Sequence, residues 1–135
     1  MNQSIVAVCS PQLLQSARSN GEVASLLPQH LIHIIGHENH WLKVRHGLGL
    51  AVVGASPGPS VDTTLAALEL AASGAGCALA HRIFLAAYLA TGRLVAAIDR
   101  EFADDNSYFI VMPERPQRPR REVLAFRDWL MAAAQ

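Results

Sequence analysis

Residues 61–80 read VDTTLAALELAASGAGCALA and combine the signals of a helix, a turn and a buried strand. Asp62 is a favourable N-cap for a helix over 63–73. The apolar positions expected to form one stripe of that helix are Leu65, Leu68 and Ala72. Two glycines then end the helix, and residues 77–80 are small and apolar, as in a buried strand. A helix joined directly to a buried strand is typical of an α/β fold.

The same alternation extends in both directions from this stretch. Residues 4–9 (SIVAVC) form a β-branched run that ends at Ser10, the expected N-cap of a helix over 11–18 with Pro11 at its first position. Further strands are expected over 30–35, 50–53, 93–98 and 107–112, further helices over 22–27, 41–46 (capped by Asn39), 82–91 and 120–133, and an acidic loop over 99–105. The sequence therefore predicts an α/β fold with a mostly parallel sheet flanked by helices.

Composition excludes several classes of protein. The chain has 135 residues, 11 basic and 11 acidic side chains, and 51% hydrophobic residues. Disordered chains combine low hydrophobicity with high net charge, and nucleic-acid binders carry a basic excess, so neither class is indicated. No apolar run approaches the ~20 residues that span a bilayer. The first residues lack the basic region of a signal peptide, so we expect a cytoplasmic protein without membrane contact.

Residue types that carry catalysis or bind metals occur without a supporting pattern. Four histidines lie at positions 30, 33, 37 and 40, but Gly36 interrupts the helix that would align them as metal ligands. Cys9 and Cys77 are too few for a disulfide framework or a zinc site, and no histidine or aspartate is placed near either by sequence. We therefore expect no catalytic residue, no metal and no cofactor, and a protein that is not an enzyme.

Hydroxyl side chains at two expected helix starts are the candidate ligand contacts. Thr63 and Thr64 place hydroxyls and backbone N–H groups at a helix N-terminus, and Ser10 offers the same chemistry. Such an end carries partial positive charge, which suits a carboxylate or another small anion. Both starts follow strands, where α/β sheets bind ligands. Simple helix capping is the alternative explanation for all three residues.

Several of these stretches also carry a family resemblance. The matching segments are VCSPQLL (8–14), WL (41–42), HGL (46–48), VDTTLAALELAASGAGCAL (61–79), LATGRLV (89–95), YFIVMP (108–113) and FRDWL (126–130). In this order and spacing, the chain resembles the later part of the effector-binding (substrate-binding) domain of LysR-type transcriptional regulators. It is similar to the subgroup that contains the glycine-cleavage and β-lactamase regulators.

The resemblance implies a fold, a site and a mechanism. The family's effector module resembles a periplasmic binding protein, with two subdomains joined by crossover strands and a small-molecule effector in the cleft between them. Residues 1–112 would be the second subdomain with both crossover strands (4–9 and 107–112), and residues 113–135 would dock on the first subdomain. Ser10, Thr63 and Thr64 match positions that line the second subdomain's side of the cleft. The resemblance implies a small-molecule effector, and the chemistry of the helix starts described above makes an anionic metabolite the expected one.

The resemblance also implies missing parts. The match begins at the first crossover strand, so the first subdomain is incomplete and the helix-turn-helix that contacts DNA is absent. We expect a truncated regulator that binds effector weakly or not at all by itself. The apolar face of the last helix (Val123, Phe126, Trp129 and Leu130) loses its docking partner, so it is expected to fold back or to pair two chains into a homo-oligomer.

Two other interpretations stay open at this point. One is a free-standing small-molecule-binding or oligomerisation module. The other is a small hydrolase or metal-binding protein that uses Cys9 or the histidines of residues 30–40. Stabilisation by zinc would favour the second of these.

Overall fold

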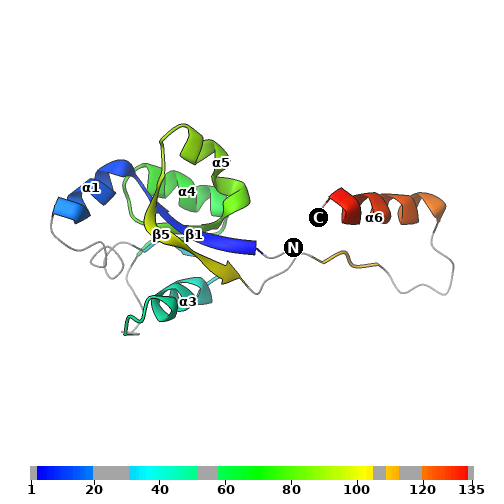
Figure 1. The fold of residues 1–135 in the computed structure, drawn as a ribbon, viewed down its shortest axis with the longest axis horizontal. Helices are drawn as coiled ribbons and strands as arrows, with labels where there is room; N and C mark the ends of the chain where they lie inside the picture. Colours follow the sequence, from blue (N-terminus) through cyan, green and yellow to red (C-terminus); the bar gives the residue numbers. More distant parts are fainter. Residues whose placement is uncertain (1–2, 20–30, 52–57, 105–108, 113–119, 134–135) are drawn as a thin grey trace. The chain divides into compact units, whose positions relative to one another are not determined.

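The computed structural model describes residues 3–19, 31–51, 58–104, 109–112 and 120–133 (Figure 1). The chain divides into two compact units, one of residues 4–103 and the other of residues 1–3 and 104–135. None of the helices in the described ranges has the length and apolar character needed to span a membrane.

Strands and helices alternate along the chain, as the sequence predicts. In chain order the elements are β1 (Gln3–Cys9), α1 (Pro11–Ser19), β2 (His33–Ile34), α3 (Asn39–Gly47), β3 (Ser60–Val61), α4 (Thr64–Ala72), β4 (Ala78–His81), α5 (Arg82–Ala90), β5 (Val95–Asp104) and α6 (Arg121–Ala133). The predicted strand 4–9, the cap at Ser10 and the helices near 11–18 and 82–91 are confirmed. The predicted helical turn over 22–27 lies outside the described residues.

The prediction of a mostly parallel sheet is wrong. The three-stranded sheet has the order β4-β1-β5, and β1 pairs with β4 in the antiparallel sense, with Ile5 opposite His81. In the described ranges, parallel pairing occurs between the two-residue strands β2 and β3 and at a bridge between Leu31 and Cys77. The alternation of strands and helices thus gives only short parallel contacts. Strand β1, the first in the chain, instead lies between β4 and β5, which come much later in the sequence.

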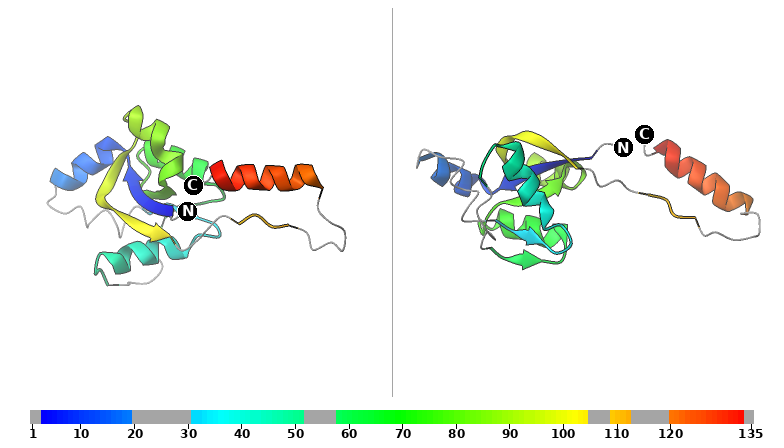
Figure 2. Two further views of the ribbon diagram at one scale, coloured as in Figure 1. Left: turned by 45° about the vertical axis from the view of Figure 1, so that its right-hand side comes forward. Right: turned by 90° about the horizontal axis from the view of Figure 1, so that it is seen from below.

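Strand β1 is buried on both faces, which explains its continuous apolar run. Its odd-numbered residues, from Ile5 to Cys9, pack in a core with α1 and α3 that includes Trp41. Its even-numbered residues, Val6 and Val8, pack in a second core with α4 and α5. Figures 1 and 2 show α4 and α5 on one side of β1 and α3 on the other.

The start and buried face of α4 differ from the prediction. Thr63, not Asp62, is the N-cap, because its side chain accepts the N–H of Ala66. The residues that α4 buries are Ala67, Leu68 and Ala71. Leu65 is 64% exposed, so the stripe predicted through Leu65, Leu68 and Ala72 is wrong. The helix is apolar nearly all round (TLAALELAA), so its sequence does not specify one face.

Four other element predictions fail in the described residues. The predicted acidic loop from residue 99 is the second half of β5. Glu101 is exposed, pairs with Arg82 and accepts a hydrogen bond from Ser4, whereas Asp104 is buried. Residues 109–112, the described part of the predicted strand 107–112, form no strand, and neither do residues 50–51. Asn39 is the first residue of α3 rather than its cap, a position taken by Glu38.

Helix α6 forms its own apolar surface. The rings of Phe126 and Trp129 stack with centroids 5.8 Å apart, and both side chains are mostly exposed. Arg127 and Asp128 form an ion pair on the same helix. The predicted helix over 120–133 is confirmed.

Candidate functional site

The N-terminus of α4 presents unpaired donors. Thr63 is extended (φ −133°), and its Oγ1 accepts the N–H of Ala66 at 3.2 Å. Helix geometry gives the N–H groups of Thr64 and Leu65 no acceptor within the helix. The end of the helix therefore combines free donors with partial positive charge, which favours an anion.

A hollow opens beside this helix end. It opens to solvent and spans about 230 Å³ when the open solvent at its mouth is included. Its walls come from the ends of β2 and β4, from β1 and from the starts of α3 and α4: Ile5, Ile34, His37, His40, Thr64, Leu79, Ala80 and His81. Of the described residues that line it, none is acidic. The hollow therefore offers apolar walls and polar groups that donate hydrogen bonds.

Three imidazoles cluster in this hollow. The ring centroids of His37 and His40 are 4.7 Å apart, and those of His40 and His81 are 6.3 Å apart with the rings nearly perpendicular. His40 is only 7% exposed, whereas His37 lies at the surface. The three rings come from two distant parts of the sequence, which the antiparallel pairing of β1 and β4 and the packing of α3 bring together.

One acidic side chain lies near the rim of the hollow. The Oε1 atom of Glu38 accepts the N–H of Gly36 at 2.9 Å. This hydrogen bond holds the pKa of the Glu38 carboxyl below its ordinary value, and the neighbouring His37 acts in the same direction. The carboxylate is thereby engaged with the backbone at the start of α3.

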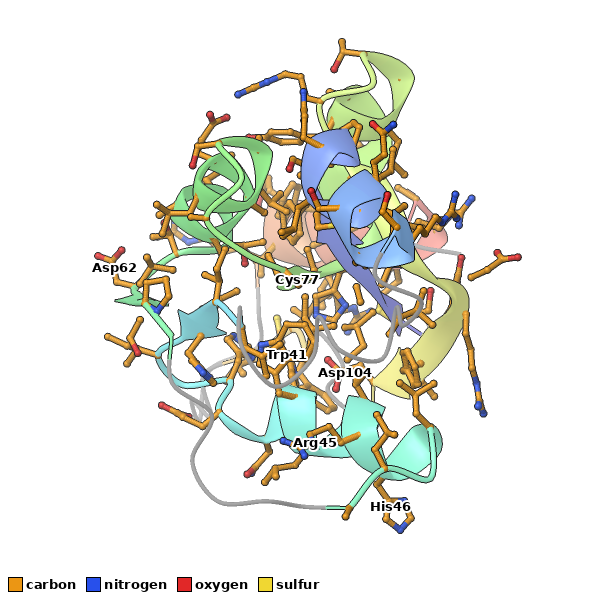
Figure 3. The ribbon with its side chains drawn as sticks, turned by 90° about the vertical axis from the view of Figure 1, so that its left-hand side faces the viewer. Trp41, Arg45, His46, Asp62, Cys77 and Asp104 are labelled. Atoms are coloured by element: carbon orange, nitrogen blue, oxygen red, sulfur yellow. The ribbon has the colours of Figure 1, made fainter. Side chains whose placement is uncertain are left out.

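Trp41 fixes α3 against β2 next to the hollow. Its side chain is buried, and its Nε1–H donates to the Ile32 carbonyl at 2.9 Å. It lines an adjoining space of about 190 Å³ that also touches His37 and His40. Figure 3 shows Trp41 in the interior, above α3, while Asp62 and His46 lie at the surface.

The structure separates the three residues predicted from the sequence. Thr64 lines the hollow, and Thr63 precedes it as the helix cap. Ser10 is 1% exposed, and its Oγ accepts the N–H of Leu13 at 3.2 Å. A Cβ on Gly74 would lie 3.7 Å from that oxygen, so Ser10 is beside the far end of α4, roughly 13 Å along the helix from Thr64.

Sequence reasoning missed the histidines that line the hollow. It considered His37 and His40 only as metal ligands on one helix, and it gave His81 no role. Within the described part of the chain, no group of three or more histidine, cysteine, aspartate or glutamate side chains is arranged to hold a metal ion. The signal that could have found this site is the group of histidines in residues 30–40, close to the end of a predicted strand. Such a group indicates a polar site, but it does not show that the site binds a metal.

Comparison with known proteins identifies the family. Residues 1–135 match the family described as the LysR substrate binding domain. The chain belongs to this family. This match confirms the resemblance predicted from the motifs. Members of the LysR family are transcriptional regulators, a class distinct from enzymes.

Individual relatives agree with this assignment. The glycine cleavage system transcriptional activator of Escherichia coli K12 is 27% identical over 130 residues, which is 96% of this chain and 42% of that protein. The chain thus spans less than half the length of the curated relatives it matches.

Solved structures of LysR effector domains share the fold. The effector domain of the regulator AmpR of Pseudomonas aeruginosa superposes with a TM-score of 0.81 at 26% identity, and the match covers 99% of this chain and 63% of that one. The AmpR effector-binding domain of Citrobacter freundii gives a TM-score of 0.73 at 19% identity over 98% of this chain and 64% of that one. The LysR-type effector fold predicted from the sequence is therefore confirmed, with the correction to strand direction given above.

Proposed function

We propose that this LysR-family chain is the effector-sensing portion of a transcriptional regulator and that its hollow binds the carboxylate end of a small metabolite. The observation that carries this proposal is that His37, His40 and His81 line one hollow together with Thr64, the first residue of α4.

The donor set matches a carboxylate. The His37 imidazole, the Thr64 hydroxyl and the first N–H groups of α4 can donate hydrogen bonds, and a carboxylate accepts several at once. The hollow is small and open to solvent, so it suits one end of a ligand better than a whole one.

The remainder of the ligand would meet a second surface. In the two-subdomain arrangement that the family resemblance implies, residues 1–112 form one wall of the cleft and the first subdomain forms the other. An effector that contacts both walls binds the closed arrangement more tightly and shifts the population towards it. DNA contact then belongs to a helix-turn-helix region rather than to residues 1–135, and the site of action is the cytoplasm.

The three predicted contacts have different roles in this proposal. Thr64 contacts the ligand directly. Thr63 orients the helix end through its cap, and Ser10 anchors α1 through its own hydrogen bond to Leu13. Contact of any of the three with effector stays a prediction.

Replacing Thr64 with valine is the test of this site. Acetate, the simplest carboxylate, is expected to shift the amide resonances of Thr64 and Leu65 and the ring resonances of the three histidines, with a Kd on the order of millimolar. Loss of one hydroxyl donor in Thr64→Val should weaken binding about fivefold. NMR titration of the full chain, against chloride at equal ionic strength, measures both effects.

Thr91→Val is the matched control. Thr91 is also next to a helix end, but its Oγ1 donates to the Ala87 carbonyl on α5, away from the hollow. It should leave the acetate Kd unchanged. Equal weakening by both substitutions, or acetate shifts confined to residues outside the hollow, would contradict the proposed site.

We also propose that two copies of the chain pair through α6. Phe126 and Trp129 are 61% and 62% exposed, and burying such side chains contributes roughly 1.5–3 kcal/mol each. A second copy buries the same face twice under two-fold symmetry. This proposal is the finer form of the oligomer expected from the sequence.

Phe126→Glu should convert the pair into monomers. The substitution places a charge in the centre of the apolar face, and light scattering after size exclusion should show the mass fall by half. Arg121→Glu places a glutamate on the opposite face of α6 and should leave the mass unchanged. A wild-type chain that is monomeric at high concentration would contradict pairing.

A further inference from the structure

Cys9 and Cys77 are cross-strand neighbours. In the antiparallel pairing of β1 with β4, Val6 lies opposite Ala80 and Val8 opposite Ala78. Continued by one position, this register places Cys9 opposite Cys77, just past the last pair of the ladder and before β4 begins. Both side chains are fully buried in one core, and both are free thiols joined by a side-chain hydrogen bond.

The geometry of such a pair suits a disulfide. Residues directly opposite in antiparallel strands have Cα atoms about 4.5 or 5.5 Å apart, depending on the hydrogen-bond pattern. Disulfides span Cα separations of roughly 4.4–6.8 Å. The two sulfur atoms can therefore join with little movement of the backbone.

The two thiols are chemically unequal. Cys9 immediately precedes the cap of α1, and hydrogen bonds from the Cys77 thiol and the Leu14 backbone lower its pKa despite burial. The pKa of Cys77 is raised by its hydrogen bond to Cys9 and by burial. This asymmetry makes Cys9 the nucleophile and Cys77 the second, resolving thiol.

We propose that Cys9 and Cys77 form an oxidation site that a peroxide converts to a disulfide between the end of β1 and the residue that precedes β4. In the first step the Cys9 sulfur attacks one peroxide oxygen of hydrogen peroxide, the O–O bond breaks, and water leaves with a Cys9 sulfenic acid in place. In the second step the Cys77 sulfur attacks the sulfenic sulfur, the S–O bond breaks, and a second water leaves. Each thiol loses its proton, the two sulfurs lose two electrons in all, and the peroxide is reduced.

Burial determines the rate at which this site reacts. Because both sulfurs are inaccessible in the closed structure, peroxide reaches them only when the end of the ladder opens locally. We therefore expect reaction slower than that of an exposed thiol, and faster when low urea concentrations promote opening. This inference is independent of the proposed effector site.

Peptide mapping of the native chain tests the site directly. The full chain is treated with hydrogen peroxide, blocked with iodoacetamide and digested with trypsin, which cuts after Arg18, Arg45 and Arg82. The expected product is a disulfide-linked pair of peptides 1–18 and 46–82, lighter by two hydrogen atoms than the separate peptides. A disulfide closing a long loop should also raise Tm by roughly 10 °C, and dithiothreitol should reverse the rise.

Cys9→Ser and Cys77→Ser are the control variants. Neither can form the link, so peroxide should leave the Tm of each unchanged. Should either variant fail to fold, reversal of the Tm shift by dithiothreitol in the wild-type chain still decides the question. Linked peptides that appear only in denaturing urea, or native thiols that oxidise no further than sulfenic or sulfinic acid, would overturn the proposal.

Discussion

Trp41→Ala is expected to lower the free energy of unfolding by about 3–5 kcal/mol, as observed when a large buried aromatic side chain is removed. Trp41 is 5% exposed and packs in the core that contains Val44 and Phe102. It also donates the hydrogen bond from its indole N–H to the Ile32 carbonyl. Urea unfolding followed by circular dichroism measures the loss.

Trp41→Phe separates packing from hydrogen bonding. Phenylalanine keeps most of the aromatic volume but leaves the buried Ile32 carbonyl without the indole donor, so we expect a smaller loss of about 1–3 kcal/mol. A result in which both variants lose the same free energy would assign the whole effect to the hydrogen bond. A loss below about 1 kcal/mol in Trp41→Ala would contradict the packing of α3 described above.

Leu68→Ala is expected to cost about 2–5 kcal/mol, because it opens a cavity in the core between α4 and β1. Leu68 is fully buried and contacts the cluster that includes Val8 and Leu85. The same urea measurement applies, and the change in midpoint should appear without a change in slope if the unfolded state is unaffected.

Leu65→Ala is the matched control on the same helix. Leu65 is mostly exposed, and its replacement with alanine, the best helix former, should change the free energy of unfolding by no more than ~0.5 kcal/mol. The sequence alone predicts the same large cost at both positions, since both were assigned to one stripe. Equal losses would therefore restore the sequence prediction and contradict the structure.

These variants illustrate what local sequence signals determine. The order of the elements, the cap at Ser10 and the end of α5 at Gly92 follow from capping and turn residues that act within a few positions. The buried face of α4 does not, because a helix of alanines and leucines offers several equivalent faces and tertiary packing selects one. The direction of β1 likewise depends on β4, a partner far along the chain.

The candidate site, like the fold, was predictable from the sequence only where local chemistry determines it. The helix end at Thr63 and Thr64 could be recognised from local chemistry. His81 could not be placed beside His40, and Cys9 could not be placed beside Cys77, because both juxtapositions follow from the register of β1 with β4 and from packing against distant elements. The overall fold could still be predicted from the family resemblance, because the short motifs that carry it are spread over most of the chain.

Strand β1 carries both proposed sites. Ile5 lines the hollow at one end and Cys9 faces Cys77 at the other, about 14 Å away along a single rigid strand. Thermodynamic linkage then imposes a reciprocal relation: any ligand that binds the dithiol and disulfide forms with different affinity must shift the reduction potential of the pair by the same free energy. A tenfold difference in affinity corresponds to about 30 mV for this two-electron couple. The fraction of chains that carry the disulfide would then depend on the metabolite concentration as well as on the redox potential of the surroundings.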